Sequence, residues 1–169
     1  MKLWLKQLAF VLAALLLLAA ESKAGPIRLA FRDTTIVGGT TFDYAIYVDS
    51  SLTGFNVSSY QLEFTFNSSY FTFVSATAVG TMTETWGLLD ANEISAGRIR
   101  VAGSGATVLS GTGKLVSVRF TAKVLTFDVS GGFTFQSSTL NEGNPLTSHW
   151  NGTVTVNRPP FITVSPDTW

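Results

Sequence analysis

Apolar and polar residues alternate along most of the chain, and this period of two restricts the fold more than any other feature of the sequence. Such a period is typical of a β-strand that is buried on one face and exposed on the other. In the stretch TFDYAIYVDS one face carries Phe42, Tyr44, Ile46 and Val48, and the other carries Asp43, Tyr47 and Asp49. The stretch SSYQLEFTFN separates Tyr60, Leu62, Phe64 and Phe66 from Ser59, Gln61, Glu63 and Thr65. Each such strand must bury its apolar face against another layer.

Nine runs of this kind predict nine strands, bounded by Gly, Ser and Asn residues that favour turns. No stretch after residue 25 keeps a helical period. We therefore predict an all-β fold, a nine-stranded antiparallel β-sandwich with jelly-roll topology. The predicted strands lie within residues 26–33, 41–50, 58–67, 70–78, 83–87, 98–104, 114–124, 131–140 and 152–157.

The stretch GSGATVLSGTG at residues 103–113 is built almost wholly of small residues. Glycine permits positive φ angles and close approach of the backbone. We therefore predict a connector that crosses from one sheet to the other, with Val108 and Leu109 tucked beneath it.

The first 24 residues have the pattern of a secretory signal peptide. Lys2 and Lys6 precede an apolar run at residues 8–20, and the small residues Ser22 and Ala24 follow it. The run is short for a membrane span, so we predict export to the cell surface or medium with no membrane insertion after cleavage. Residues 25–169 contain eight basic and ten acidic residues, a net charge of −2, which offers no footprint for nucleic acid.

The last residues depart from the alternating pattern. Pro159 and Pro160 cannot join a central strand, and they stiffen the chain into an extended linker. We divide the chain into a signal peptide at 1–24, a β-sandwich at 25–157, and a linker with the start of a truncated following module at 158–169. A short ordered tail is the alternative for the last segment.

The order of these segments resembles the cohesin domain over residues 28–156. The resemblance rests on VGGTTFDYAIYVDS, YQLEFTFNSSYFTFVSATAVG, AGRIRVAGSGATVLSGTGKLVSVRFTAKV and STLNEGNPLTSHWNGTVTV, taken in this order. It implies a non-catalytic module that binds a dockerin-type protein partner in a scaffold or surface protein associated with polysaccharide degradation. Cofactors are not expected.

Family dockerins dock on one sheet face that includes the third, fifth, sixth and eighth strands. Here those strands resemble residues 59–66, 83–87, 98–103 and 132–136. The resemblance and the alternation together give a candidate partner-binding set of Ser59, Gln61, Glu63, Thr65, Arg98, Arg100, Thr134 and Gln136. An ion pair of Glu63 with Arg98 or Arg100 would orient a partner.

The sequence departs from the family pattern at two places that bear on partner choice. The family commonly has an Asp-Pro turn after the third strand, and this chain has Asn67, Ser68 and Ser69 instead. Positions that hold Asn and Asp in well-known cohesins are Ser59 and Gln61 here.

Catalysis is not expected, because the chain has one histidine and no cysteine. His149 is predicted to be an exposed loop residue before the last strand. Asp43, Asp49 and Glu63 are too dispersed to suggest a glycosidase pair. Residues 90–93, DANE, are predicted to be a solvated loop and not a metal site.

Carbohydrate binding is the alternative function, since sandwich modules hold sugars on exposed aromatic rings. Tyr47, Trp86 and Trp150 are the candidate rings. The competing interpretation is that Trp86 packs inward and Tyr47 is an ordinary strand residue. A structural spacer in a bacterial surface protein is a third class.

Overall fold

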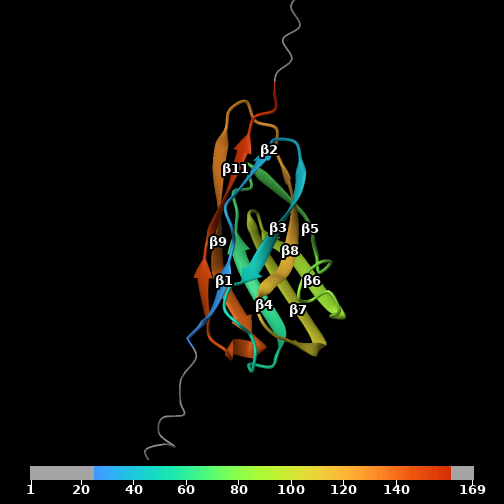
Figure 1. The fold of residues 1–169 in the computed structure, drawn as a ribbon. Helices are drawn as coiled ribbons and strands as arrows, with labels where there is room; N and C mark the ends of the chain where they lie inside the picture. The colour runs from blue at the N-terminus through green and yellow to red at the C-terminus, as the bar shows by residue number, and fades with distance from the viewer. Residues whose placement is uncertain (1–24, 161–169) are drawn as a thin grey trace, which may run out of the picture.

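A computed structural model describes residues 25–160, which form two β-sheets packed face to face (Figure 1). One sheet has five strands in the order β10-β1-β3-β8-β5, and the other has six in the order β2-β11-β9-β4-β7-β6. The predicted two-sheet sandwich is confirmed. Within the described range no helix is long and apolar enough to cross a membrane. The predicted signal peptide and most of the last segment, residues 161–169, lie outside the described residues.

The described residues contain eleven strands and one short 3₁₀ helix. The strands are β1 (Ile27–Ala30), β2 (Thr34–Val37), β3 (Thr41–Val48), β4 (Val57–Thr65), β5 (Phe71–Thr77), β6 (Leu88–Ser95), β7 (Arg98–Leu109), β8 (Gly113–Ala122), β9 (Val129–Leu140), β10 (Thr147–Trp150) and β11 (Gly152–Asn157). The helix, η1, is Asn141–Gly143.

The structure has eleven strands where nine were predicted. The two that were missed are β2 and β10, which have four residues each and lie at sheet edges. The first predicted run, 26–33, ends as a strand at Ala30, and the chain then passes to the other sheet. Phe31 is buried between the sheets at this crossing. The crossing makes two pairs parallel, β1 with β10 and β11 with β2, so the sandwich is not purely antiparallel.

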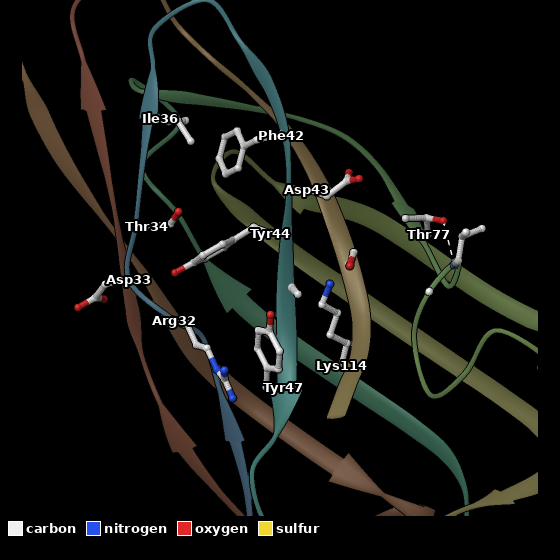
Figure 2. Close-up of a pocket in the computed structure, with 14 residues that line it drawn as sticks. Arg32, Asp33, Thr34, Ile36, Phe42, Asp43, Tyr44, Tyr47, Thr77 and Lys114 are labelled. Carbon is white, nitrogen blue, oxygen red and sulfur yellow. Dashed lines mark hydrogen bonds between the residues drawn. The ribbon is translucent and has the colours of Figure 1, made fainter. Parts of the chain in front are cut away.

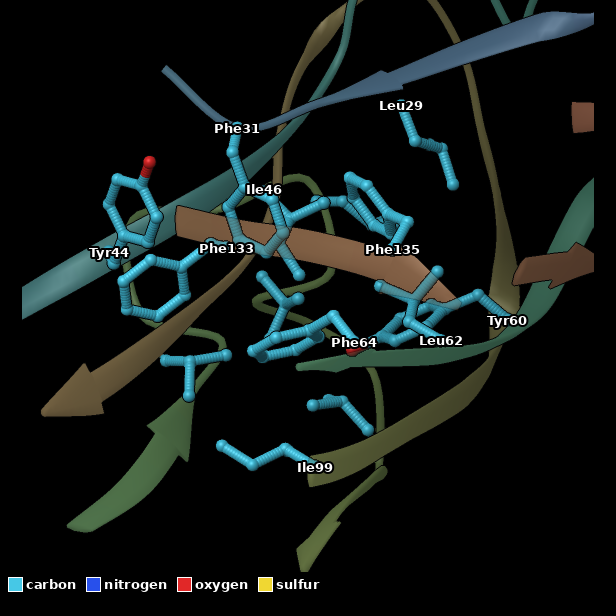
Figure 3. Packing of buried hydrophobic residues seen from close by; sticks show 14 of the residues in the cluster. Leu29, Phe31, Tyr44, Ile46, Tyr60, Leu62, Phe64, Ile99, Phe133 and Phe135 are labelled. Carbon is cyan, nitrogen blue, oxygen red and sulfur yellow. The ribbon is translucent and has the colours of Figure 1, made fainter. Parts of the chain in front are cut away.

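Phenylalanine rings fill the space between the sheets (Figure 3). Phe133 on β9 lies at their centre, with its ring centroid 4.7 to 6.5 Å from the rings of Phe31, Tyr44, Phe64, Phe66, Phe71 and Phe120. The predicted inward faces of β3 and β4 are confirmed, because their alternate aromatic and aliphatic residues are buried or half-buried. Large buried side chains supply the stability that disulfides supply elsewhere.

The predicted strand at residues 83–87 is wrong. These residues form a turn, which Thr83 anchors by donating its hydroxyl to the Leu115 carbonyl at 2.7 Å. The strand lies further on, as β6, and residues 90–93 belong to it and not to a solvated loop. β6 is an exposed edge strand with polar residues at four of its eight positions, and its outward face carries both Leu88 and Asp90, so its alternation is less clear than that of the central strands.

The predicted connector at residues 103–113 is wrong over most of its length. β7 continues to Leu109, and only residues 110–112 link it to β8 in the other sheet. Gly103 faces the Tyr60 ring and Gly105 faces the Trp86 ring, where a Cβ atom would lie 2.6 and 2.3 Å from ring atoms. The glycines are therefore strand residues that leave room for two stacked aromatic rings. Leu109 is buried as predicted, whereas Val108 is exposed.

Candidate partner-binding face

The outer face of the six-stranded sheet brings the eight predicted site residues together. β4 lies between β7 and β9, and the register places Glu63 beside Arg100 and Thr65 beside Arg98. Thr65 also pairs with Thr134 on β9, and Gln136 lies two residues further along that strand. The complete set is Ser59, Gln61, Glu63, Thr65, Arg98, Arg100, Thr134 and Gln136.

Glu63 forms the charged centre of this face with two arginines. Arg98 Nη2 donates to Glu63 Oε2 at 2.5 Å, and Arg100 Nε donates to Glu63 Oε1 at 2.8 Å. The Glu63 side chain is only 9% exposed, whereas the side chains of Arg98 and Arg100 are 44% and 49% exposed. Glu63 points outward, so the two arginine side chains cover it. One carboxylate therefore holds two guanidinium groups in place, with part of each facing solvent.

The arginines also determine how Glu63 titrates. Hydrogen bonds from Arg100 and Arg98 hold the pKa of the Glu63 carboxyl below its ordinary value of 4.5. Because this pKa is lower in the folded state than in the unfolded state, the ionised carboxylate stabilises the fold. The contribution is complete at pH values above the unfolded-state pKa, and it is lost as the pH falls through the folded-state pKa.

Glu63→Gln is expected to lower the free energy of unfolding by about 1 kcal/mol at pH 7, since the charge-assisted bonds become neutral ones and the arginines stay half exposed. Urea unfolding at pH 7 and in acid measures the difference, which should shrink as the pH falls below 4.5. The control is Glu84→Gln, at an exposed carboxylate with no ion pair within residues 25–160. An equal cost of Glu63→Gln at neutral and acid pH would contradict this account.

The two ends of the face differ in character. At one end Gln136 Nε2 approaches Thr65 Oγ1 and the Thr134 carbonyl, each at 3.4 Å. At the other end Ser59 and Gln61 border a hollow of about 260 Å³. The hollow also has apolar lining, which includes Leu88 and Ala102. The face thus combines an ion cluster with a shallow, partly apolar depression.

Sequence reasoning missed the part of this face that β6 contributes. Leu88, Asp90 and Asn92 pair with Ser104, Ala102 and Arg100 of β7, which places them on the same outer face. The inner positions Leu89 and Ala91 are half-buried. The alternation of Leu89 and Ala91 with Asp90 and Asn92 was the signal that could have located this strand.

The dispersed acidic residues do not meet at one place. Asp43 accepts two hydrogen bonds from Arg119, at 2.8 and 2.9 Å, and Arg119 holds the pKa of Asp43 below its ordinary value. Asp49 accepts one hydrogen bond from Arg32, at 3.1 Å. Both carboxylates belong to the five-stranded sheet side, whereas Glu63 is on the other sheet. Residues 25–160 contain no group of three or more His, Asp or Glu side chains that could hold a metal ion.

His149 is exposed as predicted, but it lies in β10 and not in a loop. Its Nε2 is 2.6 Å from the Ser138 hydroxyl, and its ring stacks on Phe135. Ser138 donates its own proton to Thr147 at 2.7 Å, so the network assigns the proton between Ser138 and His149 to Nε2. A histidine that donates to serine is not placed to act as its base. Partial burial lowers the pKa of His149.

The three candidate sugar-stacking rings have different environments. Trp86 is buried, and its indole Nε1 donates to the Thr107 carbonyl at 2.8 Å, so Trp86 packs inward. Tyr47 and Trp150 lie on the outer face of the five-stranded sheet, on the side of the sandwich opposite Glu63. Trp150 is 59% exposed.

Comparison with known proteins gives matches in structure and none in sequence. No protein-family model matches the chain, and no curated protein matches it. The sixth cohesin of Acetivibrio cellulolyticus scaffoldin B, solved in complex with a Cel5 dockerin, matches with a TM-score of 0.65 and 14% identity, over 79% of this chain and 99% of that one. A non-cellulosomal cohesin from Archaeoglobus fulgidus matches with a TM-score of 0.63 and 16% identity, over 78% of this chain and 91% of that one.

A cohesin module from a Clostridium perfringens family 33 glycoside hydrolase also matches, with a TM-score of 0.65 and 14% identity, over 80% of this chain and 100% of that one. These three matches cover between 78% and 80% of this chain. The chain therefore has the cohesin fold, as its sequence predicted.

Proposed function

We propose that this chain is a non-catalytic binding module that takes a dockerin-type protein partner on the outer face of the six-stranded sheet. The observation that carries the proposal is the preformed cluster of Glu63, Arg98 and Arg100 at the centre of that face. Preorganised charges orient a partner at a low cost in side-chain entropy. Three cohesins of similar fold were solved in complex with dockerins, from Acetivibrio cellulolyticus and Clostridium thermocellum.

The shape of the face also suits a protein partner. The hollow beside Ser59 and Gln61 is shallow, and Leu88, 55% exposed, stands at its border. A partly apolar depression next to a charged cluster offers both the apolar and the polar contacts that protein interfaces use. Ser59 and Gln61 replace residue types found in well-known cohesins, so we expect the preferred dockerin to differ in the residues that meet this end.

We further propose that the module acts outside the cell, in a protein associated with polysaccharide breakdown. The support for export is the charge and hydropathy pattern of residues 1–24.

Ala102→Glu tests the partner-binding face. Ala102 is a half-buried outward residue of β7 beside Gln61, so a glutamate there obstructs the hollow and adds charge next to Asp90. The full chain should bind at least one dockerin from its source genome, and Ala102→Glu should weaken that binding at least about tenfold. Surface plasmon resonance against a dockerin panel measures both.

Ala45→Glu is the matched control. Ala45 is also a half-buried alanine in mid-strand, but it lies on β3 in the other sheet, so dockerin affinity should be unchanged. Equal losses for the two variants, or no binding to any dockerin of the panel, would overturn the proposal. The second result, together with no binding to insoluble polysaccharides, would favour the spacer role.

A further inference from the structure

A row of side chains crosses the outer face of the five-stranded sheet, opposite the proposed dockerin face. Trp150 on β10 is in register with Ala30 on β1, and Ala30 is in register with Tyr47 on β3. Lys114 on β8 continues the row beside Tyr47. Residues in register on neighbouring strands project from the same side of a sheet. Since neighbouring strands lie about 4.8 Å apart, the backbones at Trp150 and Tyr47 are about 10 Å apart, with the small Ala30 between them.

An arginine lies over each of the two rings. The guanidinium carbon of Arg28 is 4.4 Å from the centre of the Trp150 ring, and that of Arg32 is 3.9 Å from the Tyr47 ring. Stacking uses the flat face of a guanidinium and leaves its N–H groups pointing along the edge. Each arginine therefore covers one face of its ring, and a ligand can meet the rest of the ring and the guanidinium N–H groups together.

The cations of this face are only partly neutralised. Arg32 is paired with Asp49, and Arg119 is paired with Asp43. The guanidinium of Arg28 and the ammonium group of Lys114 make no ion pair with any carboxylate in residues 25–160. Two positive charges near the two ends of the ring row thus have no acidic partner within the described part of the chain.

The face is hollowed beside Tyr47. A hollow of about 430 Å³ is lined by Arg32, Tyr47 and Lys114, by the carboxylates Asp33 and Asp43, and by small polar residues and apolar ones that include Ile36, Phe42 and Val79. Figure 2 shows Tyr47 between Arg32 and Lys114 at this place. Asp43 is paired with Arg119, and Asp33 accepts a hydrogen bond from the Thr153 amide at 2.8 Å. Neither carboxylate forms an ion pair with Lys114. A volume of this size suits a small-molecule or sugar ligand.

We propose that this face binds an acidic polysaccharide, a glycan chain bearing carboxylate groups, laid across β10, β1, β3 and β8. One sugar packs against the part of the Trp150 ring that Arg28 leaves exposed, and another packs against Tyr47 from the hollow beside it. The negative face of an aromatic ring attracts the weakly positive C–H groups of a sugar. Glycan carboxylates pair with Arg28 and Lys114, the two cations without an acidic partner.

Two other occupants fit these observations less well. A neutral glycan would cover Arg28 and Lys114 without supplying an anion to either, and covering an unpaired charge is costly. An acidic protein would require a broader apolar contact area than two rings separated by Ala30 provide.

Polygalacturonate and its methyl-esterified form test the proposal, because they share a backbone and differ in the free carboxylate. The full chain should bind polygalacturonate in isothermal titration and in affinity gels, and the esterified polymer at least tenfold more weakly. Trp150→Ala and Lys114→Ala should each weaken binding to polygalacturonate at least tenfold. Lys123→Ala is the matched control, since Lys123 donates to the Ser68 carbonyl and is absent from the residues that line the hollow.

Three results would overturn the proposal: no binding to polygalacturonate or alginate, equal binding to the esterified polymer, or equal binding to polyglutamate. Thermal unfolding of Trp150→Ala and Lys114→Ala verifies that both variants fold. The result is independent of dockerin binding, because Ala102→Glu should keep glycan binding and Trp150→Ala should keep dockerin binding.

Discussion

Phe133→Ala is expected to lower the free energy of unfolding by about 3 to 5 kcal/mol. Phe133 is fully buried, and six aromatic rings surround it. Those rings come from both sheets and from the crossing at Phe31, so they cannot all move inward to close the cavity. Urea unfolding followed by circular dichroism measures the loss.

Phe127→Ala serves as the control for Phe133→Ala. Phe127 lies in the connection between β8 and β9 and is 62% exposed, so its removal should change stability by less than about 0.5 kcal/mol. The ring-filled core would be the wrong account of stability if both variants cost the same, or if Phe133→Ala cost less than about 1 kcal/mol.

The two-sheet architecture was predictable because the strands that form the core alternate clearly. Every second residue of β4 and β9 faces inward over much of each strand, Phe64 and Phe133 among them, and these large rings can be buried only between two sheets. The edge strands were not predictable in this way. β2 and β10 have four residues each and are largely exposed, so their sequences contain no apolar face that a period of two could reveal.

The candidate site follows the same division. Glu63, Arg98 and Arg100 lie on the outer face of the sheet, as their alternation with buried residues on β4 and β7 predicted. Leu88 and Asp90 were missed because β6 pairs on one side only, and its polar residues resembled a loop. The stacking of Arg28 on Trp150 depends on the parallel pairing of β1 with β10, which joins residues far apart in the chain. Local pattern contains no information on such pairing.

The glycines of β7 predicted a connector, but they lie in a strand that packs against aromatic rings. Gly105→Ala is expected to lower the free energy of unfolding by about 2 to 3 kcal/mol. An added Cβ would lie 2.3 Å from two atoms of the Trp86 side chain, so the indole must move. Moving it breaks the hydrogen bond from Nε1 to the Thr107 carbonyl and disturbs its stacking on Tyr60.

The same displacement reaches the proposed dockerin face, because Trp86 comes two residues before β6 begins at Leu88. Gly105→Ala should therefore shift tryptophan fluorescence to the red and weaken dockerin binding together with stability. Chemical denaturation, fluorescence spectra and surface plasmon resonance on one preparation measure the three effects.

Gly132→Ala is the matched control, and it separates steric crowding from the general effect of removing a strand glycine. Gly132 lies in β9, where an added Cβ would meet nothing within 4 Å, so alanine should be neutral or slightly stabilising. A Gly105→Ala variant as stable as Gly132→Ala, with unchanged fluorescence, would show that β7 is not packed against Trp86. The glycine-rich stretch would then be the connector between the sheets that its composition predicted.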